Sequence, residues 1–212
     1  MDIVNEMVIY DGCFTWDMTK TSVSIAKKSK IDLVGIPPIL LQKITSEFPN
    51  IKINLMINYP YSHYAVNEIK LLMDVYINKY KHIKVVTYAL PMIDLLEEDW
   101  DTINKTLQVF GAACKELGVQ SRIIVLMGFL HDDSDVHRIG DFAEQAGISA
   151  VVLDQPEKHF MDFLLDAHEL SKGLSIPVGI MADCRDEEEL QAFVNAKFPI
   201  KVLSGENILE LD

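Results

Sequence analysis

Eight short apolar runs recur along the chain, and they constrain its fold more than any other feature. The runs are rich in β-branched residues, and most are continuous rather than alternating in polarity, which is typical of parallel strands covered on both faces. They span residues 7–11, 31–36, 51–58, 82–89, 121–128, 148–154, 175–182 and 200–204. Eight parallel strands close most simply into a barrel, so the pattern predicts an α/β fold of the (β/α)8 TIM-barrel class.

Longer amphipathic stretches separate the runs. Apolar residues at helical spacing and suitable end residues predict helices over 63–80, 98–117, 133–146, 158–172 and 186–196. No linker or low-complexity segment interrupts the series, so we expect a single domain over residues 1–212. Such barrels usually need about 250 residues, so we also expect trimmed loops and a truncated last helix. An open doubly wound sheet is the alternative architecture.

Composition limits the partners. A net charge of −13 and a pI near 4.8 argue against nucleic acid or an anionic membrane surface, because binding to either needs a basic patch. Neither a signal peptide nor a membrane-spanning run is evident. The three cysteines (Cys13, Cys114 and Cys184) are widely spaced, which favours reduced thiols and a cytoplasmic location. The expected partner is therefore a small-molecule substrate.

Common cofactor and hydrolase motifs are absent. The sequence contains no GxGxxG, GxxxxGK[ST], HExxH or GxSxG pattern, so we expect no cofactor. The segment 131–137 (HDDSDVH) offers His and Asp side chains that could bind a divalent ion. A loop and helix N-terminus rich in capping acids explains the same residues, and we predict no metal site there.

Several short matches, taken in order, carry a resemblance between about Tyr10 and Leu209. They are Asp11 with the turn 16–19, the Ile36-Pro37-Pro38 strand end, the segment 58–62 (NYPYS), Gly128, the Ala146-Gly147 turn and Val178-Gly179. Together they resemble deoxyribose-phosphate aldolase. The resemblance implies a (β/α)8 barrel with its site at the carboxyl ends of the strands, and it implies a homodimer.

The chain departs from that family at its reactive positions. The Schiff-base lysine of the family falls on Leu153, its second lysine on Met181 and its strand-4 aspartate on Lys84. Acids also fall near the phosphate-binding turns, at Asp183 and in segment 204–207 (SGEN), where they would repel a phosphate. Cleavage of deoxyribose 5-phosphate is therefore not expected.

Lys84 is one candidate for a relocated nucleophile. It lies between Ile83 and Val85 in a strand, where burial beside Arg122 would lower its pKa, and Asp11 could then move protons. Transaldolase, a related barrel enzyme, has its lysine on strand 4 and an aspartate on strand 1. The alternative is structural, because Lys84 and Arg122 come early in their strands and could pair with acids at the bottom of the barrel.

Asp154 and Asp183, at the ends of two neighbouring strands, are a second candidate pair. Two carboxylates can divide acid and base roles when their environments differ, although capping or loop positions would explain them equally. The substrate pocket is expected to include Arg122, Tyr88, Met127, Met181 and Asn207, and to be more apolar than in the family.

Three hypotheses remain open at the level of sequence. The first is a diverged aldolase-like enzyme that acts on a small carbonyl compound without a phosphate, by carbon–carbon lyase or enol chemistry. The second is a catalytically silent barrel that binds a metabolite or a partner protein. The third is an acid–base cyclase or isomerase that forms no covalent intermediate.

Overall fold

Eight parallel strands close into a barrel in the computed structural model, which describes residues 6–9, 15–31, 33–59, 66–155 and 159–204. Each strand pairs with the next in sequence, and the first strand pairs with the eighth. The strands are β1 (Glu6–Val8), β2 (Leu33–Ile36), β3 (Lys52–Ile57), β4 (Ile83–Ala89), β5 (Gln120–Leu126), β6 (Ala150–Asp154), β7 (Val178–Ala182) and β8 (Ile200–Ser204). The predicted (β/α)8 barrel is confirmed, and the open sheet is excluded.

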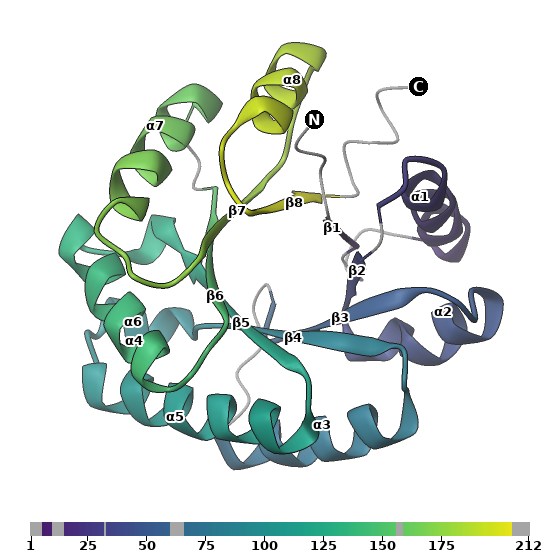
Figure 1. Cartoon of the computed structure of the whole chain (residues 1–212), viewed down its shortest axis with the longest axis horizontal. Helices are drawn as coiled ribbons and strands as arrows, with labels where there is room; N and C mark the ends of the chain where they lie inside the picture. The colour runs from purple at the N-terminus through teal and green to yellow at the C-terminus, as the bar shows by residue number, and fades with distance from the viewer. Residues whose placement is uncertain (1–5, 10–14, 32, 60–65, 156–158, 205–212) are drawn as a thin grey trace.

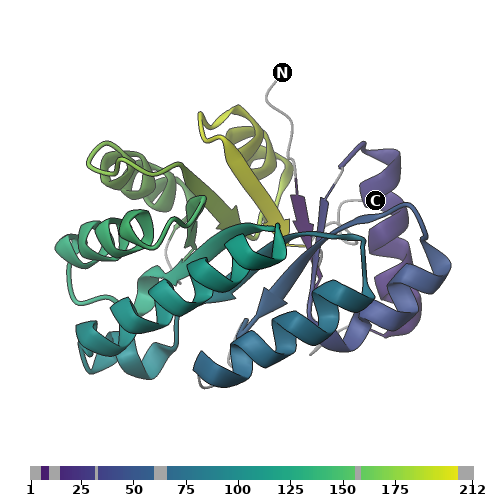
Figure 2. The same cartoon turned by 60° about the horizontal axis from the view of Figure 1, so that its bottom comes forward.

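Helices form the outer layer of the barrel (Figures 1 and 2). They are α1 (Trp16–Lys28), α2 (Leu41–Glu47), α3 (Val66–Lys79), α4 (Met92–Leu96), α5 (Trp100–Leu117), α6 (Asp133–Gln145), α7 (Phe160–Ser171) and α8 (Glu187–Asn195), with short 3-10 turns η1 (Pro38–Leu40) and η2 (Met127–Phe129). Five of them match the predicted helices, whereas α1, α2 and α4 were not predicted from spacing. The truncated helix expected after β8 falls on residues 205–212, outside the described part of the chain.

The segment 131–137 has a structural explanation. Asp132 is the N-cap of α6 and accepts from the backbone N–H of Ser134 at 2.7 Å, while Asp135 accepts from the N–H of His131 at 3.0 Å. The bond to Ser134 satisfies an amide that an α-helix leaves without a partner in its first turn, and the bond to His131 fixes the residue before the N-cap. Among the described residues, no three His, Cys, Asp or Glu side chains gather as a metal site would require.

The barrel interior has two chemically different layers. Glu6, Asn54, Thr87 and Arg122 form a polar layer toward the amino ends of the strands. Two residues further along the same strands, the interior side chains are apolar: Val8, Met56, Ala89 and Ile124. Val152, Met181 and Val202 complete the filling, and the space among these residues does not admit a water-sized molecule. The interior is therefore a packed core, as is usual in this fold.

Gly35 of β2 shows how full this interior is. A Cβ atom added there would lie 2.7 Å from Cγ2 of Val8, 3.1 Å from Oε1 of Glu6 and 3.3 Å from Sδ of Met56. We expect Gly35→Ala to lower the free energy of unfolding by about 1–3 kcal/mol through overpacking. Urea denaturation would measure the change. An unaltered midpoint would show that the interior has room for the added methyl group.

Candidate active site

Asp154 and Asp183 lie together at the carboxyl ends of two neighbouring strands. Asp154 is the last residue of β6, two residues after the interior side chain of Val152, and Asp183 directly follows β7. The end of β6 pairs with β7 through Asp154 and Met181. The adjacency expected from sequence is therefore present at the mouth, where barrel enzymes of this class place their sites.

The two carboxyl groups differ in environment. Asp154 is partly buried, whereas Asp183 is exposed. Burial, as the larger cause, and the negative charge of Asp183, as the smaller one, raise the pKa of Asp154 to about 8. The Asp154 carboxyl therefore keeps its proton at neutral pH. Two carboxyl groups held in different protonation states can act as an acid and a base.

Gln155 fixes the backbone beside this pair. Its N–H donates to the carbonyl of Met181 at 3.0 Å, and its side-chain oxygen accepts from the N–H of Asp183 at 3.2 Å. The ends of β6 and β7 are thereby tied together beyond the last paired residues. These two hydrogen bonds help to hold Asp154 and Asp183 near one another.

Tyr59, which follows β3, reaches this pair from another part of the barrel. Its hydroxyl donates to Oδ2 of Asp154 at 3.4 Å, and its side chain packs on the apolar layer of the interior. Met92, at the start of α4, and Phe129, in η2, pack on the same layer. None of these three residues was predicted as a site residue, although each lies just beyond a predicted strand, where mouth residues are expected.

Lys84 is not placed as its proposed role requires. It is the second residue of β4, at the amino end of the barrel, and its side chain is exposed. The burial on which the nucleophile interpretation depended is absent, and the mouth is at the opposite ends of the strands. Asp11, its expected acid–base partner, lies outside the described residues.

A buried lysine does occur on β8, but it serves a helix. Lys201 is 1% exposed, and its Nζ donates to the carbonyls of Val194 at 2.6 Å and Ala196 at 3.2 Å, at the carboxyl end of α8. A cation at this end of a helix is favourably placed for the carbonyls that the helix leaves without partners. This amine therefore has a structural explanation.

Arg122 lies inside the barrel and binds Glu6, which was not predicted as a partner. Its Nη1 is 2.6 Å from Oε2 of Glu6, and Asn54 donates to the other oxygen of Glu6 at 2.5 Å. Thr87 donates to Oδ1 of Asn54 at 2.8 Å. The apolar layer separates this network from the mouth, so Arg122 matches the structural alternative, a pair with an acid in the lower half of the barrel.

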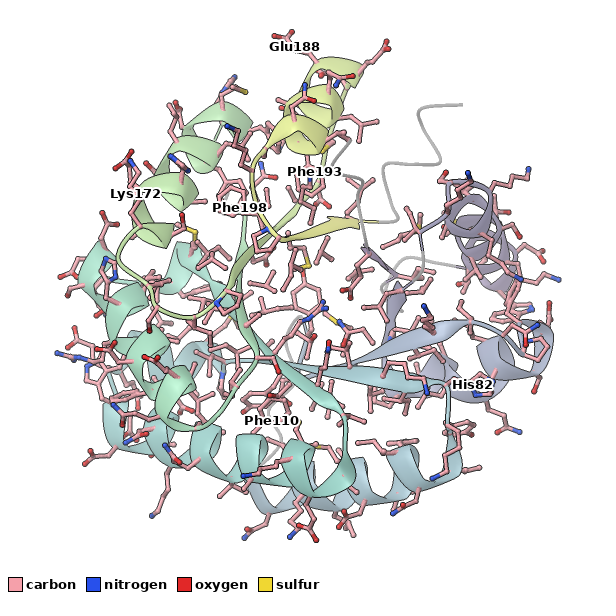
Figure 3. The ribbon with its side chains drawn as sticks, viewed as in Figure 1. His82, Phe110, Lys172, Glu188, Phe193 and Phe198 are labelled. Atoms are coloured by element: carbon pink, nitrogen blue, oxygen red, sulfur yellow. The ribbon has the colours of Figure 1, made fainter. Side chains whose placement is uncertain are left out.

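Tyr88 and Met127 were expected in the pocket but lie on the outer side of the barrel wall. The ring of Tyr88 packs 5.5 Å from that of Phe110 on α5, which Figure 3 shows on the barrel-facing side of that helix, and Met127 packs on the same outer core. For Tyr88 the parity of β4 explains this, because alternate side chains of a strand face opposite ways, whereas Met127 lies just beyond β5 in η2. Met181 does face the interior, and Asn207 lies outside the described residues.

The same parity corrects the position expected for a lysine on β6. Leu153 belongs to the core between the barrel and its helices, whereas Val152 faces the interior and Asp154 the mouth. Cys184, near the mouth, is buried, and this burial, with nearby acids, raises its pKa to about 12. The thiol is therefore neutral and poorly suited to act as a nucleophile.

Comparison with solved structures shows that this barrel has the same fold as several aldolases. A protein named as a deoxyribose-phosphate aldolase from Coccidioides immitis superposes with a TM-score of 0.76 at 11% identity, over 99% of this chain and 83% of that one. The tetrameric deoxyribose phosphate aldolase of Aeropyrum pernix gives a TM-score of 0.70 at 14% identity, over 98% and 88% of the two chains. The chain shares the aldolase-type barrel fold.

Other comparisons are less specific. A type I 3-dehydroquinate dehydratase from Clostridium difficile superposes with a TM-score of 0.65 at 10% identity, over 96% of this chain and 84% of that one. No protein-family profile and no curated protein matches the sequence. None of the described helices has the length and apolar character needed to cross a membrane. The homodimer and the cytoplasmic location stay predictions.

Proposed function

We propose that this chain is a barrel enzyme that transfers protons on a small carbonyl compound lacking a phosphate, without a covalent intermediate. Asp183 takes a proton from the carbon next to the carbonyl, and Asp154 donates to the carbonyl oxygen. The observation that carries this proposal is the partly buried Asp154 carboxyl beside the exposed Asp183 at the mouth. Such proton transfer can end as an isomerisation or a cyclisation.

The negative charge at the mouth favours a substrate without a phosphate group. Asp183 is followed by Asp186 at the N-cap of α8 and by Glu187, Glu188 and Glu189 in its first turn. These acids occupy the helix end that would otherwise favour an anion, so a phosphorylated substrate would be repelled. The aldolase-type fold supports carbonyl chemistry only by analogy.

Hydrogen exchange offers a direct test that needs no knowledge of the natural substrate. A panel of small aldehydes and ketones in heavy water would be followed by NMR for deuterium uptake at the carbon next to the carbonyl. We expect exchange with the wild-type protein that is lost in both Asp154→Asn and Asp183→Asn. Equal exchange by the wild type and the variant carrying both substitutions would reject the proposal.

Lys84→Ala provides a separate prediction. Because Lys84 is exposed at the amino end of β4, we expect the variant to keep wild-type exchange rates and stability within about 0.5 kcal/mol. Treatment of the wild-type protein with aldehydes and borohydride should leave Lys84 unmodified in mass spectra, apart from the slow labelling shared by exposed lysines such as Lys28. Selective labelling of Lys84 would restore the Schiff-base hypothesis.

The catalytically silent barrel is the second candidate. The filled interior favours it, since the space among the interior side chains does not admit a water-sized molecule. A ligand would then bind above the apolar layer rather than within the barrel. This candidate is favoured if a compound shifts the melting temperature of the protein while no compound in the panel exchanges hydrogen.

A further inference from the structure

Tyr59 and Asp154 bring two O–H hydrogen-bond donors together across the mouth of the barrel. Tyr59 follows β3 and Asp154 ends β6, so two strands separate their origins, yet the hydroxyl of one reaches Oδ2 of the other. We infer that these two groups form an oxyanion site that holds the oxygen of an enolate or a phenolate. The inference rests on the proposed function and adds to it Tyr59, together with the chemical class of the ligand.

The distance between the two oxygens suits a shared acceptor. At 3.4 Å their hydrogen bond is longer than the 2.5–3.0 Å usual between two oxygens, so it is weak and costs little to give up. An acceptor oxygen about 2.7 Å from each could lie between two donors at this spacing after a small opening movement. The free protein thus has the two groups close to the arrangement that they need in the complex.

Both groups can donate without carrying a charge of their own. A tyrosine hydroxyl is neutral well above neutral pH, and Asp154 keeps its proton up to a pKa of about 8 because of burial and the charge of Asp183. Of the described residues, the ionisable groups that act on Asp154 are Asp183, which follows β7, and Tyr59, which follows β3. A tyrosine beside a protonated carboxylic acid is an effective oxyanion hole.

The apolar surroundings strengthen the hydrogen bonds to the oxyanion and restrict the kind of ligand that can bind. Tyr59, Met92 and Phe129 are partly buried and pack on the apolar layer, which gives the site an apolar floor. Hydrogen bonds to a developing charge are worth more in such surroundings than in water. A flat, delocalised anion with one strongly basic oxygen fits a floor of this kind, whereas the charge of Asp183 disfavours a multiply charged phosphate.

Asp183, Tyr59 and Asp154 together supply every group that the proton-transfer step needs. The carboxylate of Asp183 accepts the proton from carbon, and the electron pair of the broken C–H bond forms the carbon–carbon double bond of the enolate. The carbonyl π electrons move to oxygen, which then accepts hydrogen bonds from Tyr59 and Asp154. Transfer of the Asp154 proton to that oxygen gives the neutral enol and leaves Asp154 as a carboxylate.

Phenols provide the test, because a phenolate has the charge distribution of an enolate but does not react. We would titrate the protein with 4-nitrophenol and related phenols and follow the absorbance of the ionised form. Tyr59→Phe keeps the ring and removes only the hydroxyl, so we expect about tenfold weaker binding. At a pH at which Asp154 is protonated in both proteins, Asp183→Asn should bind phenolate more tightly than wild type, since it removes a repelling charge. Tyr76→Phe, on α3, is the matched control and should bind as wild type does.

A second measurement separates hydrogen bonding from simple packing. The hydroxyl of Tyr59 lowers the pKa of Asp154, so Tyr59→Phe should raise that pKa above its wild-type value when the carboxyl carbon is followed by NMR. A residue that only packed on the apolar floor would leave this titration unchanged. Equal phenolate affinity in the wild type and Tyr59→Phe, or no phenolate binding by the wild type, would overturn the inference.

The outcomes also distinguish this inference from the proposed function. Phenolate binding that depends on Tyr59, without hydrogen exchange on any carbonyl compound, would keep the oxyanion site and reject the enzymatic reaction. Exchange that depends on Asp154 and Asp183, without phenolate binding, would keep the reaction and reject the oxyanion site.

Discussion

Asp154→Asn is expected to slow carbonyl-dependent hydrogen exchange by about 10²- to 10⁴-fold, the usual contribution of a positioned acid or base. The substitution preserves the size of the side chain but removes the proton that the acid would transfer. Asp162→Asn, at an exposed position in the first turn of α7, is the matched control and should keep full activity. A loss in the control equal to that in Asp154→Asn would contradict a specific role.

The same residue should set the alkaline limit of activity. Burial and the charge of Asp183 raise the pKa of Asp154 to about 8, so the protonated acid dominates below that pH and disappears above it. We expect kcat/KM to fall as pH rises through about 8. A rate that continues to rise with pH beyond 10 would indicate that the protonated form of Asp154 is not required.

Asp154→Asn should lower activity but raise stability at alkaline pH. Asp154 has a pKa near its ordinary value of 3.8 in the unfolded chain and about 8 in the folded protein, so between these values the folded protein binds more protons. The free energy of unfolding contributed by this residue therefore falls as pH rises from about 4 to about 8. Asp154→Asn lacks this loss, and we expect it to resist urea better than the wild type above pH 8.

The barrel could be predicted because each buried parallel strand leaves a continuous apolar run in the sequence. The helices α1 and α2 were harder to predict for a physical reason. The first is held by its Thr15 N-cap and has a polar overall composition, and the second has only seven residues. Both depend on packing against the barrel, which a local pattern does not reveal.

The residues of the candidate site could be predicted only where a side chain lies at the carboxyl end of a strand. Asp154 and Asp183 end two apolar runs, so the rule that sites lie at the carboxyl ends of strands finds them. Lys84 comes early in its strand, as the sequence indicates, but its exposure was not predictable, because the pairing of β4 with β3 shifts register at this residue. Tyr59 was missed because its contact with Asp154 joins residues 95 positions apart.

Glu6 was not predicted as an interior residue because it precedes the apolar run that indicates β1. Its pairing with Arg122 should nevertheless contribute strongly to the stability of the barrel. It is 1% exposed and pairs with Arg122 across the polar layer of the interior. We expect Arg122→Met to lower the free energy of unfolding by about 3–5 kcal/mol, because it leaves a buried carboxyl without its charged partner. The exposed pair of Lys20 and Glu47, 3.7 Å apart, is the control, and Lys20→Met should cost less than about 1 kcal/mol.

The pH dependence of this loss identifies its cause. Burial already raises the pKa of Glu6, and Arg122 opposes that rise, so removal of Arg122 should raise the pKa further. The folded variant then holds a proton that the unfolded chain releases above its ordinary pKa of 4.5, and its stability should fall steadily as pH rises from there. A variant with both Glu6→Gln and Arg122→Met has no such carboxyl, so its unfolding free energy should be less dependent on pH. Parallel pH profiles for the two variants, measured by urea denaturation, would show that the loss arises from packing of the arginine side chain rather than from its charge.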